Sequence, residues 1–155
     1  MILWRPTGLE ELQLIADADM RAFPPRLPGQ PIFYPVLNEE YARQIAQRWN
    51  TKDSSHLGFV TRFEVDDQYV ARFGREVVGS RVHEELWVPA EDLEEFNRHI
   101  VGRIEVVAVF LGDGWRDRVA GGSRASSLMS SLAERAEARD DAALALVMRR
   151  VAAEL

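Results

Sequence analysis

The stretch Phe59–Val65, which reads FVTRFEV, has the most regular alternation of apolar and polar side chains in the chain. Successive side chains of a strand point to opposite faces of a sheet, so a period of two is typical of a half-buried strand. The odd-numbered residues of this stretch are therefore expected to face the core. Val60, Arg62 and Glu64 are expected to face outward.

The flanking sequence predicts strands and helices in an order that suits an α+β fold. Extended segments are expected at residues 1–4, 32–36, 82–88 and 104–110, with a short one within 74–79. Helices are expected at residues 9–19 and 38–50, with short helices after residues 66–67 and after Pro89. This order predicts a single α+β domain with a small mixed or antiparallel sheet. The near-continuous apolar character of the last strand indicates a central position in that sheet.

Three helix starts carry residues that are typical of caps. Thr7 and Glu10 have the spacing of a capping box, in which each side chain satisfies the other's backbone amide. Asn38 and the pair at 66–67 are predicted to accept hydrogen bonds from the free amides of the helices that follow them.

The chain divides into two compositional regions. Residues 1–110 carry the acidic excess and are predicted to form the core domain. Residues 111–155 begin with a Gly/Ser linker at 120–123 and continue as alanine-rich helix formers, so they are predicted to be a helical extension. Because short helices are marginal when isolated, this extension is expected to dock on the core, dock on a partner or fray.

Composition limits the classes of function. A chain of 155 residues with 46% hydrophobic and 28% charged residues is typical of a globular protein. The net charge of −6 argues against nucleic-acid partners, which require a cationic face. The absence of cysteine and the scattered positions of the three histidines predict no metal site, and a cytoplasmic location is expected. No apolar run is long enough to predict a membrane span.

Residues 82–89 form an apolar strand pattern that contains two carboxylates and an imidazole. Acidic residues are depleted from strands, so their presence requires a reason. Alternation places His83, Glu85 and Trp87 on one face, which combines a base, a carboxylate and a flat ring. Such a combination is typical of small-molecule clefts, whereas solvated acids on an edge strand are the alternative.

Five side chains in all are candidates for chemistry. Glu85 could stabilise a developing positive charge or act as a general base, with His83 close by. Arg5 lies just past the first expected strand, and its planar guanidinium suits a phosphate or carboxylate, although a surface salt bridge is the alternative. Phe33 and Tyr34 could stack on a flat ring, or they could be core aromatics.

The proline-rich segment 22–31 contains four prolines and cannot form a helix or a central strand. It is interpreted as a rigid wall of the folded domain. The alternative is a recognition ligand for modules with aromatic grooves. Two charge pairs, Arg62 with Glu64 and Glu94 with Arg98, are predicted to be ordinary surface contacts.

Three segments carry a resemblance to known proteins: LWRP at 3–6, FYPVLNEEYA at 33–42, and the stretch from His83 to Asn97. Residues 1–110 resemble short bacterial proteins labelled "ADP-ribosylation/crystallin J1". More distantly, the order of segments is similar to that of small ADP-ribosyltransferase-like domains of bacterial toxins. Those domains begin with a strand that ends in arginine or histidine, continue through an aromatic strand and a helix, and place a glutamate on a later strand. The second motif here lacks the Ser-Thr-Ser element of many such enzymes.

The resemblance implies an ADP-ribosyltransferase-like fold with NAD as a possible substrate and no metal. On that basis Arg5 would hold the phosphate or ribose of NAD, while Tyr34, beside Phe33, would stack on nicotinamide. Glu85 would stabilise the transition state of ADP-ribose transfer to an unknown acceptor, with His83 assisting. The alternative is a non-enzymatic module that binds a nucleotide or a protein, and an unknown protein partner is expected to use the C-terminal helices. Convergence of Arg5, Tyr34 and Glu85 in one cleft would favour the enzyme.

Overall fold

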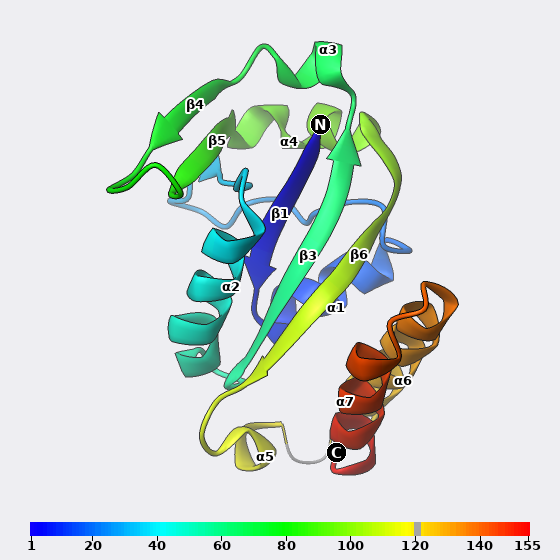
Figure 1. Cartoon of the computed structure of the whole chain (residues 1–155). Helices are drawn as coiled ribbons and strands as arrows, with labels where there is room; N and C mark the ends of the chain where they lie inside the picture. Colours follow the sequence, from blue (N-terminus) through cyan, green and yellow to red (C-terminus); the bar gives the residue numbers. More distant parts are fainter. Residues whose placement is uncertain (120–121) are drawn as a thin grey trace.

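The protein is an α+β domain, and its computed structural model describes residues 1–119 and 122–155 (Figure 1). The strands are β1 (Ile2–Thr7), β2 (Ile32–Phe33), β3 (Leu57–Val65), β4 (Gly74–Val77), β5 (Glu84–Pro89) and β6 (Ile100–Leu111). The α-helices are α1 (Leu9–Asp17), α2 (Glu39–Arg48), α3 (Asp67–Val70), α4 (Leu93–Arg98), α5 (Trp115–Arg118), α6 (Ser123–Ala138) and α7 (Ala142–Ala153). Two 3₁₀ turns are η1 (Asn50–Lys52) and η2 (Ala90–Asp92). This order confirms the α+β prediction, and residues 120–121 of the expected linker lie outside the described residues.

The strands form two small antiparallel sheets that are joined at one residue. The first sheet has the order β1-β3-β6, and the second has the order β2-β5-β4. Val36, just beyond β2, pairs with Trp4 of β1 on one side and with Glu85 of β5 on the other. Because both bridges are antiparallel, the two sheets continue into one another through Val36.

The alternation of β3 is confirmed except at Val60. The odd-numbered residues from Phe59 to Val65 are buried, and Arg62 and Glu64 are exposed, as predicted. Val60 was expected to face outward but is fully buried, because Ala42 and Ala46 of α2 pack on that face of the sheet. The N-terminal half of β3 is therefore covered on both faces.

The prediction that the last strand is central is wrong, because β3 lies between β1 and β6. The apolar character of β6 has another cause, which is burial on two faces. Ile104 and Val106 belong to the main core, whereas Ala108 packs against the cluster under α2. A strand at the edge of a sheet can thus be apolar when other elements cover both of its faces.

Two of the three predicted caps are confirmed. Asn38 Oδ1 accepts a hydrogen bond from the Tyr41 amide at 3.1 Å, and Asp66 Oδ1 accepts one from the Tyr69 amide at 2.8 Å. The capping box at the start of α1 is wrong, because Gly8 occupies the N-cap position. Thr7 instead ends β1 with a buried side chain, so its hydroxyl does not reach the helix amides.

The C-terminal helices α6 and α7 dock on the core. Met129 of α6 and Met148 of α7 are fully buried in the same apolar cluster as Ile104 of β6. Polar contacts reinforce this docking, since Arg135 and Arg139 of the helix pair both form ion pairs with Glu105 of β6. Of the three expected outcomes, docking on the core is therefore the one observed. Figure 1 shows the helix pair beside β6.

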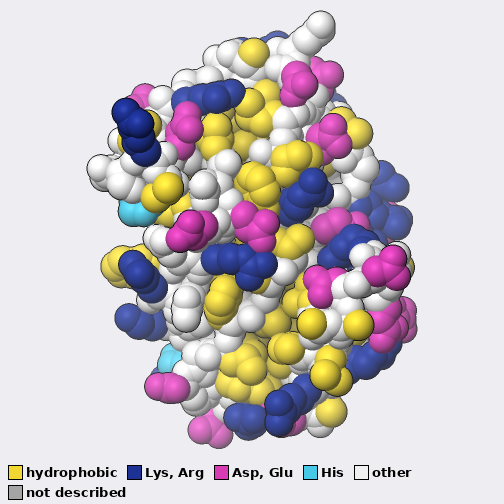
Figure 2. All heavy atoms as spheres, in the orientation of Figure 1, with side chains coloured by type: hydrophobic (Ala, Val, Ile, Leu, Met, Phe, Trp, Pro, Cys, Tyr) yellow, Lys and Arg dark blue, Asp and Glu magenta, His cyan; other side chains and the backbone are white. Residues whose placement is uncertain are grey.

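Charged side chains are dispersed over the visible face of the molecule. Figure 2 shows cationic and anionic groups interspersed among apolar ones there, without a large region of one sign. Among the described residues, no helix is long and apolar enough to cross a membrane.

Candidate functional site

The bridges at Val36 decide which predicted site residues can meet. Paired residues of an antiparallel ladder project to the same face, so Trp4, Val36 and Glu85 share one face of the joined sheets. Arg5 follows Trp4 along the same strand and therefore projects to the opposite face. Arg5 and Glu85 consequently belong to two separate places, one on each side of the sheet.

The first place is a cleft of about 520 Å³ beside Arg5, which we call the arginine cleft. One wall is the start of α1, and a second wall is the proline-rich loop from Pro24 to Leu27. Residues 50–55 close the end of the cleft. The proline-rich segment thus lines the cleft as a wall, which is the first of its two interpretations.

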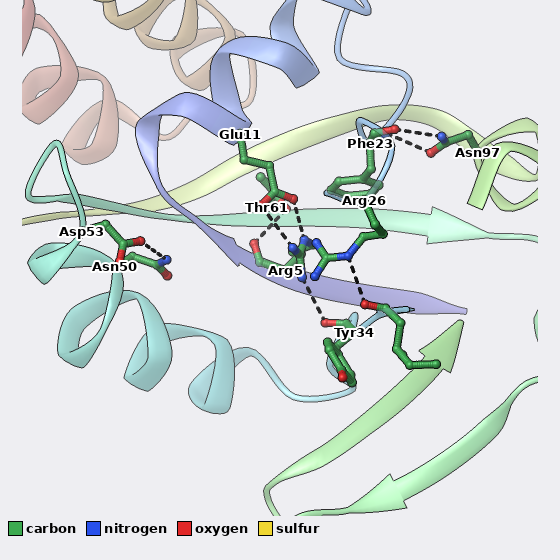
Figure 3. A network of polar contacts seen from close by, with 10 residues as sticks. Arg5, Glu11, Phe23, Arg26, Tyr34, Asn50, Asp53, Thr61 and Asn97 are labelled. Atoms are coloured by element: carbon green, nitrogen blue, oxygen red, sulfur yellow. Dashed lines mark hydrogen bonds and ion pairs between the residues drawn. The ribbon is translucent and has the colours of Figure 1, made fainter. Parts of the chain in front are cut away.

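Arg5 is held by contacts within the protein at the base of the arginine cleft (Figure 3). Its Nε donates to Glu11 Oε1 at 2.7 Å and its Nη2 donates to Glu11 Oε2 at 3.1 Å, so the pair is bidentate. Its Nη1 donates to the Tyr34 carbonyl at 3.4 Å, and its guanidinium lies 4.8 Å from the ring centre of Phe33. Arg5 is only 9% exposed, so most of its hydrogen-bonding capacity is directed inward.

Arg26 is a second guanidinium in the arginine cleft, and sequence reasoning missed it. Its Nε donates to the Ile32 carbonyl at 3.0 Å, and within the described residues it forms no ion pair. Burial lowers the pKa of the Arg26 guanidinium from its ordinary value, and the nearby positive charge of Arg5 adds to this effect. The group nonetheless stays cationic at neutral pH. The only signal in the sequence was an arginine within the proline-rich wall.

The far end of the arginine cleft is rich in hydrogen-bond acceptors. Glu10 Oε1 accepts from the Ser54 hydroxyl at 3.0 Å, and Asp53 Oδ2 accepts from Asn50 Nδ2 at 3.1 Å. Asn50 Oδ1 is buried and has no partner among the described residues.

The second place lies on the opposite face of the sheet and surrounds Glu85. We call it the aromatic cluster; it consists of Tyr34, Tyr41, His83, Glu85 and Trp87. Tyr41 of α2 donates its hydroxyl to Glu85 Oε1 at 2.7 Å, and Trp87 Nε1 donates to Glu85 Oε2 at 3.3 Å. The predicted grouping of Glu85 and Trp87 on one face of β5 is thus confirmed, whereas His83 lies just before the strand and joins the cluster through Tyr41.

Ring contacts complete the aromatic cluster. The Tyr34 ring meets the Trp87 ring nearly at right angles, with 5.9 Å between the ring centres. The His83 imidazole stacks on Tyr41 at 4.5 Å. Its Nδ1 lies 3.1 Å from the Val78 carbonyl, which favours the tautomer that carries the proton on Nδ1. The Nε2 atom of the neutral ring is then an acceptor.

Glu85 and its surroundings change the acidity of Tyr41. Partial burial is the largest cause, and the hydrogen bond to Glu85 and its negative charge act in the same direction. Together they raise the pKa of Tyr41 to about 12. Tyr41 is therefore a hydrogen-bond donor to Glu85 throughout the neutral range and cannot serve as a base there.

The five predicted site residues fall on the two sides of the sheet. Arg5 and Phe33 lie on the core side, and Glu85 and His83 lie in the aromatic cluster. Tyr34 connects the two places, since its carbonyl accepts from Arg5 and its ring contacts Trp87. Phe33 is 1% exposed and packs against Phe23, so core packing is the alternative that describes its position.

No protein-family model matches the chain, and no match was found among curated proteins or solved structures. Within residues 1–119 and 122–155, no group of three or more histidine and acidic side chains is arranged to hold a metal ion.

Proposed function

We propose that the protein is a nucleotide-binding module that holds NAD or ADP-ribose in the arginine cleft. The observation that carries this proposal is the guanidinium of Arg26, which lies partly buried in the cleft without an ion-pair partner among the described residues. A desolvated cation of this kind is stabilised by an anionic ligand, and its planar fork suits a phosphate.

The polarity of the cleft favours a nucleotide over a simple anion. Arg26 provides donors at one end, where a pyrophosphate would lie, and the Arg5 guanidinium that is bound to Glu11 lies beside it. Glu10 and Asp53 provide carboxylates at the other end, where ribose hydroxyls could donate to them. Apolar wall residues such as Leu14, Pro24 and Leu27 supply surface for a base, and the volume lies in the range of small-molecule sites.

Binding without transfer is the form of the proposal that the geometry favours. An ADP-ribosyltransferase built from Arg5, Tyr34 and Glu85 requires these side chains around one ligand. Glu85 does not line the arginine cleft and lies on the other face of the sheet. Transfer of ADP-ribose to an acceptor is therefore the second candidate, supported by the position of a carboxylate on β5 beside Tyr34 and Tyr41.

Calorimetric titration of the full chain with NAD and with ADP-ribose tests the proposal, with released nicotinamide measured in the same samples. We expect saturable binding of both ligands and no release of nicotinamide. Arg26→Gln should weaken binding by roughly tenfold to a hundredfold, because a charged hydrogen bond to phosphate is lost.

Arg62→Gln is the matched control, since Arg62 is an exposed arginine on β3 that projects away from the cleft. It should bind like the unaltered protein. Absence of binding to both ligands, or equal binding by Arg26→Gln, would reject the nucleotide-binding function. Release of nicotinamide that depends on Glu85 would establish the second candidate instead.

A further inference from the structure

Glu85 carries a negative charge that no cation of the described residues neutralises. Both of its oxygens accept hydrogen bonds, but the donors are the neutral side chains of Tyr41 and Trp87. The adjacent carboxylate differs, since Glu84 Oε1 lies 4.0 Å from Arg75 Nη1 on the other face of β5. Glu85 is also half-buried, so its charge is less screened by water than that of an exposed acid.

The groups around this carboxylate are aromatic. Trp87 is 41% exposed, and Tyr34, Tyr41 and His83 are half-buried. They come from three different segments: the end of β2, helix α2 and the strand β5 with its preceding turn. Tertiary structure has therefore gathered four rings around one anion, and the negative faces of tyrosine and tryptophan add to its attraction for a cation.

We propose that the aromatic cluster binds the trimethylammonium group of an organic cation. Such a group requires no hydrogen bonds, and it is recognised by aromatic faces together with a nearby negative charge. A guanidinium suits the site less well. Its bidentate contact with a carboxylate would compete with the bonds that Tyr41 and Trp87 already make to the two oxygens.

Two sources can present this chemistry, and they are separated by the choice of probe. Choline represents a free small molecule, and a short peptide with one trimethyllysine represents a protein partner. Each probe has a matched neutral or unmethylated control: 3,3-dimethyl-1-butanol, which is the uncharged isostere of choline, and the same peptide with ordinary lysine.

The experiment is titration of the full chain with each probe, followed by calorimetry and by tryptophan fluorescence. We expect choline or the trimethyllysine peptide to bind about tenfold or more tightly than its control. The isostere of choline lacks the charge, and the ammonium of ordinary lysine is charged but strongly hydrated. Binding should change the fluorescence, and Trp87→Phe should remove most of that change. Equal binding of the cation and its isostere, or no binding of either methylated probe, would reject the proposal.

Variants of the two neighbouring glutamates distinguish binding at this site from a general effect of the net charge. Glu85→Gln should weaken binding by roughly tenfold, since it removes the charge while it keeps the shape. Glu84→Gln changes the net charge equally but lies on the other face, so it should bind like the unaltered protein. Equal weakening in both variants would reject a specific site, as would tighter binding of arginine than of choline. These results leave the nucleotide-binding proposal unaffected, since that proposal concerns the opposite face of the sheet.

Discussion

The arginine cleft and the aromatic cluster lie on opposite sides of the joined sheets, and they differ in the sign of the charge that is left without an ionic partner. In the cleft, Glu11 neutralises Arg5, while Arg26 remains a cation without an ionic partner among the described residues. In the cluster, Tyr41 and Trp87 bind Glu85 through neutral donors, so an anion remains. Along β1, Trp4 projects to the face of the aromatic cluster, and the next residue, Arg5, projects to the face of the arginine cleft. The difference shows that residues adjacent in sequence can face two surfaces that leave groups of opposite charge without an ionic partner.

The largest expected effect is on the stability of the arginine cleft. Arg5→Ala should lower the free energy of unfolding by about 3 kcal/mol, because it leaves the Glu11 carboxylate without its partner in a poorly hydrated place. Urea denaturation measures this change. Replacing both members in Arg5→Met with Glu11→Leu should recover most of the loss. A loss below about 0.5 kcal/mol for Arg5→Ala would mean that the pair behaves as an exposed one.

A smaller effect is expected in the aromatic cluster. Tyr41→Phe removes one hydrogen bond to Glu85 and should lower the free energy of unfolding by about 1 kcal/mol. Because the two places lie on opposite faces, its effect and that of Arg5→Ala should add to within about 0.5 kcal/mol in the double variant. Strong coupling in urea denaturation would contradict the separation of the two places.

The raised pKa of Tyr41 makes the stability contributed by the aromatic cluster depend on pH in the alkaline range. Its pKa is raised to about 12 from the ordinary 10.0, so the fold favours the neutral phenol. The corresponding stability is fully present below pH 10 and is lost as the pH rises from 10 toward 12.

Tyrosinate absorbance of the folded chain should therefore include a transition near pH 12 that Tyr41→Phe abolishes. Burial also raises the pKa of Tyr69, so the late absorbance of Tyr69 should remain in that variant. Glu85→Gln should move the Tyr41 transition to lower pH, although burial, the larger cause, should keep it above the ordinary value. An unchanged transition in Glu85→Gln would show that the carboxylate does not act on Tyr41.

The smallest effect is expected outside both places. Glu84→Gln should change the free energy of unfolding by less than about 0.5 kcal/mol, because its contact with Arg75 is long and partly exposed. Thermal or urea denaturation checks this value. A loss as large as that of Tyr41→Phe would indicate that Glu84 has a structural role that its contacts do not reveal.

Local sequence determined the elements of this protein because their physical causes are local. The alternation of FVTRFEV predicted β3, and the short polar side chains of Asn38 and Asp66 predicted the starts of α2 and α3. The period of two also predicted that Glu85 and Trp87 share a face, whereas His83 lies before β5 and joins them through its contact with Tyr41. The capping box at Thr7 failed because burial of a strand residue outweighed a local helix signal.

Tertiary structure alone decided how the strands meet and which side chains they bring together. The bridges at Val36 placed Arg5 and Glu85 on opposite faces, and this pairing leaves no trace in the spacing of either residue. The position of β3 between β1 and β6 and the approach of Tyr41 to Glu85 likewise depend on contacts between distant segments. Such contacts are set by packing of the whole core, whereas periodicity reports only which face of its own element a residue occupies.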